Sequence, residues 1–422
     1  MSFIKKPVTG MRDILPEEME LRNYLMDTIR EVYESYGFSQ MEAPVVEHIE
    51  NLTSKQGGDN EKLIFRIMKR GEKLAESGEA LKDGDFDALT DSGLGYDLSV
   101  PLSRYYSNNQ AKLQKPFKAL QMGPVFRADR PQKGRFRQFV QCDIDIFGDP
   151  TNLAEKELIL ATTEALSRIG IDKYGLKVYI NDRRILFGMV SFAGFPAEDA
   201  EKILIVLDKA DKIGAEGVDE ELRSMGYAEE SISKLRSILD SYKGSSDSVR
   251  AMGRDIDNEE IKAACENVAD IMESIAAMKS RNISLCFDPT LVRGMGYYTG
   301  TIFEAKVESF GSSVCGGGRY DKMIGRFTGQ DVPAVGFSIG FERIVTILLE
   351  GGCELPKQKE KLAVLMEKGM SPEKVGEIFE LCEEERRKGR RVFVAWMAKN
   401  KKFQKEGLAN EGYGEIREFF NN

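Results

Sequence analysis

The first extended pattern of apolar and polar positions covers residues 16–36. Apolar side chains recur there every three or four residues, at Leu21, Leu25, Ile29, Val32 and Tyr36. This spacing puts them on one face of a helix. Pro16 is tolerated in a first helical turn, and Gly37 ends the pattern. We therefore predict an amphipathic helix over residues 16–36.

Short runs of strand character follow this helix. Residues 38–46 read as a strand interrupted by Pro44, which indicates a sheet edge or an interface because proline cannot donate to a strand ladder. Further strands are predicted at 61–70, 94–103, 117–127, 138–147 and 176–182, with a helix pattern at 153–170. Because few long helices separate these strands, an antiparallel sheet is favoured over a doubly wound parallel one.

The pattern changes near residue 195. From there to residue 280 nearly all apolar positions follow a helical period, which we interpret as a helical insertion. Strand patterns return between 283 and 348, and the linker-like "GGCELPKQKEK" precedes a small β-α-β-α unit. The predicted organisation is α+β: an antiparallel-sheet domain in two parts (1–194 and 281–350), a helical insertion domain (195–280) and a small C-terminal α/β domain (358–422).

Composition narrows the class of protein. The chain of 422 residues is 41% hydrophobic and 31% charged, with no apolar run long enough for a membrane helix and no secretory signal. Its six cysteines are scattered without a C-x-x-C pair, which argues against a disulfide framework and a thiolate metal site. The single histidine, His48, suits a surface position. Histidine-ligated zinc and a Ser-His-Asp triad are therefore disfavoured.

The net charge is −9, yet one segment is strongly basic. Residues 127–139, "RADRPQKGRFRQF", surround Asp129 with five cations, at Arg127, Arg130, Lys133, Arg135 and Arg137. Strand patterns on both sides predict a long hairpin with a cationic loop. Arginine binds phosphate oxygens two at a time, so a phosphate site is one interpretation. A solvated surface hairpin is the other, and the segment alone leaves both open.

Two glycine-containing segments are further candidates. In residues 291–305, "LVRGMGYYTGTIFEA", glycines allow close backbone approach, although an ordinary core strand with a surface arginine is the alternative. Adjacent residues of a strand point to opposite faces, so we expect only one of Tyr297 and Tyr298 to face a pocket. In residues 311–321 three consecutive glycines open a helix-like "RYDKMIGRF" and fit the floor beneath a small ligand, without the spacing of a mononucleotide loop.

Taken in order, these segments resemble class II aminoacyl-tRNA synthetases. "MEAPVVE" resembles motif 1, the dimer-interface strand, while "FRADRPQKGRFRQF" resembles motif 2 and "GFSIGFER" resembles motif 3. "GMRDILPEE", "LVRGMGYYTGTIFEA" and "GGGRYD" are similar to histidyl-tRNA synthetases, and this similarity extends over nearly the whole chain. The sequence departs from the commoner family pattern at Gly95, Asp145 and Gly296.

The resemblance implies a set of site residues. Arg127 would hold the α-phosphate of ATP, and Arg293 would be the catalytic arginine beside it. Further ATP contacts would come from Arg135, Phe139 and Arg343. The histidine site would consist of Asp97, Ser99, Gln141, Asp145, Arg293, Tyr297, Tyr298 and Tyr320. At the hairpin tip, Arg130, Gln132 and Lys133 would contact the acceptor end of tRNA.

The resemblance also implies a reaction and its partners. Histidine and ATP would give histidyl-adenylate and pyrophosphate, and histidine would then pass to the 3′ end of tRNA(His). The enzyme would be a cytoplasmic homodimer that uses Mg²⁺, with no metal ligand assigned to a protein side chain. The attacking carboxylate is already ionised at neutral pH, so no general base is needed. We expect the anticodon-binding unit at 358–422 to be shorter than is usual in the family.

Two alternatives remain. A synthetase-like regulatory subunit of ATP phosphoribosyltransferase would bind histidine without charging tRNA. Such a sensor needs no triphosphate clamp, whereas this sequence retains the whole set, Arg127, Arg135, Arg293 and Arg343. A general nucleic-acid-binding protein is disfavoured by the acidic total charge and by aromatic residues that do not interleave with the cations.

Overall fold

The computed structural model describes residues 3–53, 60–78, 82, 84–85, 87–132, 134–281, 283–294, 296–353 and 360–421. These residues form two compact units, the first ending at Gly352 and the second beginning at Cys353. No helix among the described residues is both long enough and apolar enough to cross a membrane.

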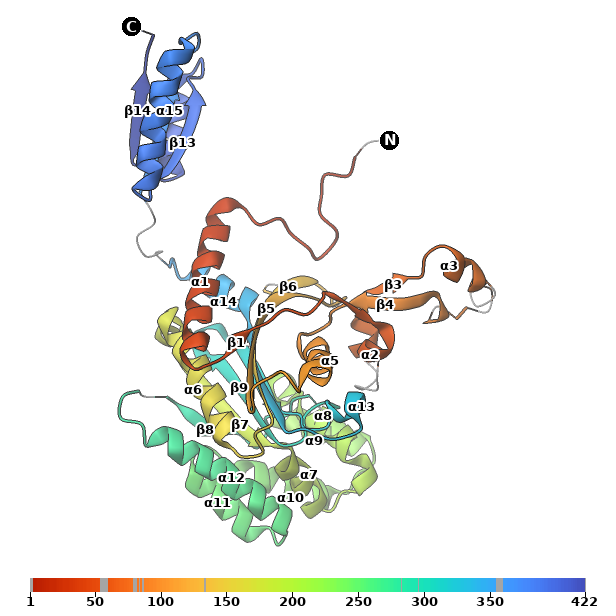
Figure 1. Cartoon of the computed structure of the whole chain (residues 1–422). Helices are drawn as coiled ribbons and strands as arrows, with labels where there is room; N and C mark the ends of the chain where they lie inside the picture. The colour runs from red at the N-terminus through yellow and green to blue at the C-terminus, as the bar shows by residue number, and fades with distance from the viewer. Residues whose placement is uncertain are drawn as a thin grey trace. The chain divides into compact units, whose positions relative to one another are not determined.

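An eight-stranded sheet is the centre of the first unit (Figure 1). Its order is β1 (Ser39–Gln40), β5 (Phe117–Phe126), β6 (Gln138–Phe147), β11 (Ala334–Gly340), β10 (Ser312–Arg319), β9 (Thr301–Val307), β7 (Leu176–Asp182) and β8 (Leu285–Phe287). The pairs from β5 to β7 are all antiparallel, and only the edge pairs β1–β5 and β7–β8 are parallel. The predicted antiparallel sheet is thus confirmed.

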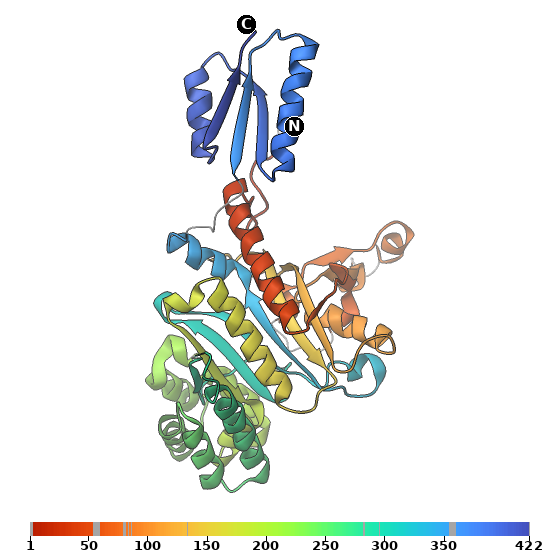
Figure 2. The same ribbon diagram turned by 60° about the vertical axis from the view of Figure 1, so that its left-hand side comes forward.

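Helices α1 (Pro16–Ser35) and α6 (Leu153–Arg168) pack together on one face of this sheet (Figure 2). The amphipathic pattern of residues 16–36 is confirmed as α1, although Tyr33 is buried in place of the predicted Tyr36. Helix α14 (Phe341–Glu350) follows β11 and contacts β6 and β10. Helices α1 and α6 therefore cover one face of the large sheet, and other elements can pack on its opposite face.

A small three-stranded sheet follows α1 and β1. It contains β2 (Val46–His48), β4 (Thr90–Leu94) and β3 (Arg66–Met68), with short helical segments α2 (Ile49–Thr53), η1 (Asn60–Leu63), α3 (Glu72–Glu76) and η2 (Asp87–Leu89). The strand predicted over 38–46 is divided between two sheets around Pro44, which has no N–H to continue a ladder.

The prediction of a strand over residues 94–103 was wrong. β4 ends at Leu94, and helix α5 (Ser99–Asn109) begins four residues after Gly95. The Asp97 carboxylate accepts the backbone N–H of Val100 at 3.1 Å and so satisfies a donor in the first turn of α5. Pro101 lies early enough in the helix to be tolerated.

The helical run predicted from residue 195 is confirmed. It contains η4 (Ala197–Asp199), α8 (Ala200–Leu207), α9 (Ala210–Ser224), α10 (Glu229–Ser241), α11 (Ser246–Asp255) and α12 (Glu259–Ala276), preceded by α7 (Arg183–Phe192) and η3 (Ile171–Tyr174). Helix α12 packs on β7 and β8, so the bundle lies at that edge of the large sheet (Figure 1). Beyond β9, η5 (Glu308–Phe310) and α13 (Gly325–Thr328) complete the first unit.

The second unit is a parallel three-stranded sheet with the order β13-β12-β14. Its elements are β12 (Lys361–Met366), α15 (Pro372–Arg387), β13 (Arg391–Trp396), α16 (Lys401–Asn410) and β14 (Glu415–Phe419). The β-α-β-α pattern predicted from sequence is present. β14 was missed because its five residues include three charged ones, Glu415, Arg417 and Glu418, and only two apolar ones.

A buried ion pair joins the first and last helices of the first unit. Arg22 of α1 donates two hydrogen bonds to Glu342 of α14, at 2.7 and 2.6 Å, and these residues are 5% and 6% exposed. Glu342 also accepts the backbone N–H of Val140 at 3.3 Å. The charged residue of "GFER" that precedes Arg343 therefore holds α1, α14 and β6 together.

We predict that Glu342→Ala lowers the free energy of unfolding of the first unit by about 3–5 kcal/mol, because it leaves the buried Arg22 charge without its carboxylate. Denaturant unfolding followed by circular dichroism measures this. Asp199→Ala, which removes an exposed ion pair with Lys202, is the control and should leave the midpoint unchanged. A Glu342→Ala midpoint equal to that of the wild type would contradict the role of the pair.

Candidate functional site

Strand β6 gives the two faces of the large sheet opposite characters. Cys142, Ile144 and Ile146 are at most 2% exposed and alternate with a polar set, Gln141, Asp143 and Asp145. The Cys142 thiol lies near Arg22 and Arg30, which places the apolar set toward α1. Since side chains alternate along a strand, the polar set points to the opposite face.

The neighbouring strand β11 leaves room for these polar side chains. Gly336 pairs with Asp145 in the register of β11 and β6, and a Cβ at Gly336 would overlap the Asp145 carboxylate. Tyr320, 1% exposed, donates its hydroxyl hydrogen bond to Asp145. Burial raises the pKa of Asp145 to about 7, while the Tyr320 hydrogen bond acts in the opposite direction.

Two further tyrosines pack beside Tyr320. The rings of Tyr297 and Tyr298 meet edge to face at 4.9 Å, and Tyr297 lies 5.3 Å from the Tyr320 ring. Both tyrosines are half-buried and pack against one hydrophobic cluster. They lie in a turn before β9, so the strand alternation behind the expectation that only one faces a pocket does not apply to them.

The start of α5 brings a further carboxylate near Asp145 and Tyr297. Burial raises the pKa of Asp97, and Asp97 in turn is among the charges that raise the pKa values of Asp145 and Tyr297. Ser99 forms a hydrogen bond with the Tyr297 hydroxyl, which acts to lower the pKa of Tyr297. The structure thus brings together the predicted histidine-site residues Asp97, Ser99, Gln141, Asp145, Tyr297, Tyr298 and Tyr320.

Arg127 lies at the mouth of the hairpin between two aromatic rings. Its guanidinium is 4.3 Å from the Tyr96 ring centre and 5.2 Å from that of Phe139. It donates to the Tyr96 carbonyl at 3.0 Å and to the Gln141 side-chain oxygen at 3.3 Å. These contacts fix its direction before any ligand is bound.

Three more cations converge beside β10. Arg293 forms an ion pair with Glu304 and donates to the Ser313 hydroxyl at 2.9 Å, while Arg343 donates to the Ser313 carbonyl. Burial lowers the pKa of Arg343, and the positive charges of Arg293 and Arg135 lower it further. Because these guanidinium groups repel one another, an anion placed among them would be stabilised.

The glycine cluster allows Arg293 to lie directly on the sheet. A Cβ at Gly316 would overlap the Arg293 guanidinium, and one at Gly318 would come within 2.9 Å of the Tyr298 ring. These glycines belong to strand β10, so the predicted helix-like stretch does not begin directly after them: turns follow, and helix α13 begins only at Gly325. A glycine floor beneath a ligand fits the geometry.

The hairpin loop carries the remaining predicted residues. Arg130 and Gln132 are exposed, and Lys133 lies outside the described residues. Arg135, exposed, forms an ion pair with Asp129 at 3.0 Å. Arg137 has a structural role that the sequence did not reveal: it donates to the carbonyls of Asp129 and Thr9, at 3.1 and 3.3 Å, and so ties the amino-terminal segment to the hairpin.

Sequence reasoning missed several polar residues of the site: Tyr96, Asp143, Glu304, Ser313 and Ser338. Asp143 could have been found from the two-residue period that it shares with Gln141 and Asp145. Glu304 and Ser338 come from other strands, and only the sheet register brings them near.

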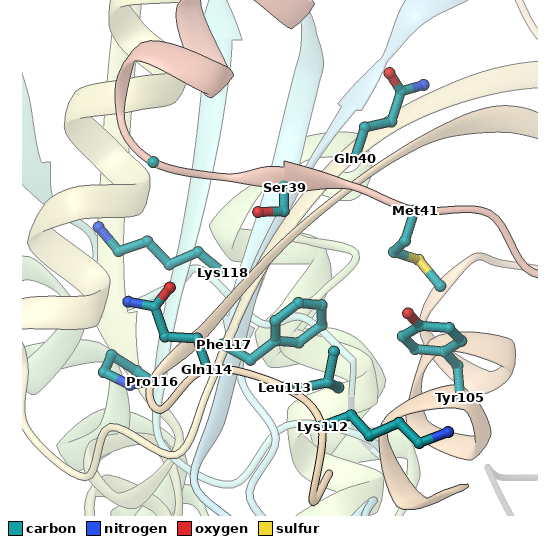
Figure 3. Close-up of a pocket in the computed structure, with 11 residues that line it drawn as sticks. Ser39, Gln40, Met41, Tyr105, Lys112, Leu113, Gln114, Pro116, Phe117 and Lys118 are labelled. Carbon is teal, nitrogen blue, oxygen red and sulfur yellow. The ribbon is translucent and has the colours of Figure 1, made fainter. Parts of the chain in front are cut away.

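The structure also has a cavity away from these residues. It measures about 530 Å³ and lies at the β1 edge of the sheet, among residues that include Ser39, Met41, Tyr105, Phe117 and Lys118 (Figure 3). The carboxylates and arginines described above are not part of its lining. It therefore marks the edge of the sheet and not the candidate site.

We predict that Asp145→Asn stabilises the ligand-free protein above pH 7. Because the pKa of Asp145 is raised, its contribution to the free energy of unfolding is fully present below pH 4 and is lost as the pH rises through about 7. The loss amounts to at most about 4 kcal/mol. Thermal unfolding from pH 5 to 8.5 should therefore show a flatter pH dependence for Asp145→Asn than for the wild type. Asp270→Asn, at a carboxyl whose pKa is lowered by Lys156 and which therefore titrates below this pH range, is the control and should keep the wild-type slope. Equal slopes for Asp145→Asn and the wild type would contradict the assignment.

Comparisons with known proteins agree with this arrangement. The sequence model of the family described as histidyl-tRNA synthetase matches residues 10–344. The histidine--tRNA ligase of Leifsonia xyli subsp. xyli is 41% identical over 415 residues, which cover 96% of this chain and 93% of that protein. The histidine--tRNA ligase of Porphyromonas gingivalis is 37% identical over 348 residues, covering 81% of this chain and 76% of that protein.

Solved structures give the same fold. A histidyl-tRNA synthetase from a Nostoc species has a TM-score of 0.79 and 27% identity, covering 98% of this chain and 90% of that one. A Bacillus halodurans protein described as an ATP phosphoribosyltransferase regulatory subunit/histidyl-tRNA synthetase has a TM-score of 0.79 at 22% identity, which shows the fold alone. On the family match and the 41% identity over most of both chains, this protein belongs to the histidyl-tRNA synthetase family.

Proposed function

We propose that this protein is a histidine–tRNA ligase, which joins histidine to ATP as histidyl-adenylate, releases pyrophosphate and transfers histidine to tRNA(His). One observation carries the proposal: a carboxylate and tyrosine pocket on β6 adjoins a cluster of mutually repelling arginines beside β10. The first suits an imidazole and an ammonium group, and the second suits a triphosphate.

The arginines supply electrostatic stabilisation in the first step. The histidine carboxylate attacks the α-phosphorus, and pyrophosphate leaves on the opposite side. Arg127 and Arg293 would hold the α-phosphate oxygens as charge builds there. Arg135 and Arg343 would bind the outer phosphates, and Phe139, beside Arg127, would support adenine. The Asp129 ion pair with Arg135 must open for this contact.

Recognition of histidine depends on pairing both ring nitrogens. Asp145, held by Tyr320, would accept one ring N–H, and Tyr298 would face the other nitrogen. An apolar competitor would leave these buried polar groups unsatisfied, which is worth roughly 10⁴-fold in discrimination. Asp97, Ser99 and Gln141 would receive the amino group, and Tyr297 would close the pocket beside Tyr320.

Magnesium would enter with ATP. Among the residues that the structure describes, no group of three or more His, Cys, Asp or Glu side chains is arranged to hold a metal ion. We propose that phosphate oxygens supply most of its ligands, as is usual for Mg²⁺ on nucleotides. The ion would neutralise charge on the departing pyrophosphate.

Two exposed surfaces would meet tRNA. The loop residues Arg130, Gln132 and Lys133 are placed in sequence at the hairpin tip, where the acceptor end would approach. In the second unit, the aromatic side chains of Trp396 and Phe403 are 45% and 73% exposed and stand among Lys399, Lys401 and Lys402. Aromatic rings between cations suit single-stranded bases, which supports a role in anticodon binding.

We further propose a homodimer through the β1 edge of the large sheet. Val45 and Val46, 37% and 48% exposed, adjoin this edge, and the cavity there has a partly apolar lining (Figure 3). We also place the enzyme in the cytoplasm, where ATP and tRNA occur and scattered cysteines stay reduced; cell fractionation tests this. The predicted division at 1–194, 195–280, 281–350 and 358–422 is kept as a proposal, with the helices as an insertion in the catalytic domain.

The regulatory-subunit alternative is less well supported. Curated relatives named as ligases are up to 41% identical over most of the chain, whereas the structure whose name includes a regulatory subunit is 22% identical. A histidine sensor also has no need for Arg135 and Arg343 beside Arg293. The tests below separate the two, because a sensor would bind histidine without exchanging pyrophosphate.

Pyrophosphate exchange into ATP, measured with each of the twenty amino acids, tests the function. We expect exchange with histidine alone, and exchange with none would contradict the enzyme. Arg293→Ala should lower the rate by about 10²–10³-fold or more, since it removes a contact that strengthens as charge builds on the α-phosphate. Arg223→Ala, at an exposed ion pair with Glu229, is the matched control and should keep the wild-type rate. Normal exchange in a folded Arg293→Ala enzyme would remove Arg293 from its catalytic role.

Light scattering tests the dimer. The wild type should have twice the mass of the chain, and Val46→Glu should shift it toward the monomer because it places a charge in the interface. Ile205→Glu changes an equally exposed residue of the helical insertion and should leave the dimer intact. A monomeric wild type, or the same shift in both variants, would contradict the β1 edge as the interface.

A further inference from the structure

Asp143 lies inside the candidate site without a role in the reaction described above. It stands on β6 between Gln141 and Asp145 and is 4% exposed. The register pairs it with Ser338 of β11 on one side and Gln121 of β5 on the other. Its side chain therefore belongs to the same polar row that forms the pocket.

The hydrogen bonds of Gln141 depend on Asp143. The Gln141 Nε2 donates to the two carboxylate oxygens of Asp143 at 3.3 and 3.2 Å, and to the Ser338 hydroxyl at 2.6 Å. The Gln141 Oε1 accepts from Arg127 at 3.3 Å. Arginine can only donate, so its contact with Oε1 sets the orientation of the amide and leaves Nε2 to donate to Asp143 and Ser338. Its oxygen faces away from Asp143, as an acceptor for an ammonium group must.

The charge around this amide also favours a cation. Among the residues that the structure describes, Asp143 forms no ion pair, although Asp145 and Asp97 lie close to it. Burial raises the pKa of Asp143 well above its usual range, and the charges of Asp145 and Asp97 raise it further. Three carboxylates gathered near one amide are stabilised by a ligand that brings positive charge.

We propose that Asp143 is a positioning residue for the amino group of the histidine substrate: it fixes the Gln141 amide with its oxygen toward the ammonium and adds negative charge behind it. The inference rests on the proposed function. It assigns Asp143 to the ammonium end of the ligand, whereas Asp145, two residues along the same strand, serves the imidazole end.

Ligands that lack one group at a time separate this role from a purely structural one. Histidinol keeps the ammonium and the imidazole but has no carboxylate. Imidazole-4-propionate keeps the imidazole and the carboxylate but has no amino group. A residue that merely supports the fold would affect the binding of all three ligands, whereas a residue that acts on the ammonium would affect only histidine and histidinol.

The test is to measure the affinity of the full chain for each of the three ligands by calorimetry. Asp143→Asn should lower the affinity for histidine and for histidinol by about 10- to 100-fold, the range for a hydrogen bond to a charged group. The affinity for imidazole-4-propionate should stay unchanged. In pyrophosphate exchange the same variant should raise KM for histidine and keep KM for ATP and kcat. Asp145→Asn, the same change two residues away, is the matched control and should weaken all three ligands.

A second variant tests whether Asp143 acts through Gln141. If Asp143 acts through the amide, Gln141→Ala should show the same ammonium-specific loss, and adding Asp143→Asn to it should cost less than it does in the wild type. Equal losses for the three ligands, or none, in Asp143→Asn would overturn the inference while histidine exchange by the wild type kept the proposed function. A wild type that binds neither histidine nor histidinol would overturn both.

Discussion

The two-residue period of strand β6 is the constraint from which the site follows. One set of its side chains, Cys142, Ile144 and Ile146, is buried toward the helix layer. The alternate set, Gln141, Asp143 and Asp145, is therefore forced onto the other face, where it is also almost fully buried. Burying polar groups is unfavourable unless they are hydrogen-bonded, so the surrounding strands must supply partners and space.

Those partners come from segments far apart in the chain. Tyr320 holds Asp145, Ser338 contacts Gln141, and Gly316 leaves the volume in which Arg293 lies. Arg293 and Arg135 have carboxylate partners, in Glu304 and Asp129, but Arg343 is held near both of these arginines in spite of their repulsion. A binding site for a polyanion has this property, because the free energy of bringing the cations together is recovered when the ligand arrives.

The hairpin and the helices are tied to this sheet by charged contacts that take no direct part in the reaction. Arg22 and Glu342 join α1 to α14, and Arg137 joins the amino-terminal segment to the base of the hairpin. The basic segment at 127–139 therefore serves two purposes. Arg127 and Arg135 are available to ATP, whereas Arg137 holds the loop that carries them.

The sequence by itself determined the elements with a clear period and the residues that belong to family motifs. Helix α1, the β5–β6 hairpin and the helical insertion follow from apolar spacing, which depends only on neighbouring residues. The resemblance of the motifs also gathered Arg127, Arg293 and Arg343 into one hypothesis, although each signal was weak alone.

Tertiary structure decided what local pattern could not. The run 94–103 contains the start of α5, where Asp97 accepts the N–H of Val100, and the glycines of β10 lie in a strand covered by Arg293 and Tyr298. Strand register alone set Asp143 against Ser338, and a turn placed the rings of Tyr297 and Tyr298 against each other, with Tyr297 beside Tyr320. The contact of Asp97 with Val100 and the turn at Tyr297 are local features that the strand interpretation overlooked. The strand register and the packing on the β10 glycines depend on residues far apart in the chain, whose contacts outweigh the small local preferences that a sequence pattern records.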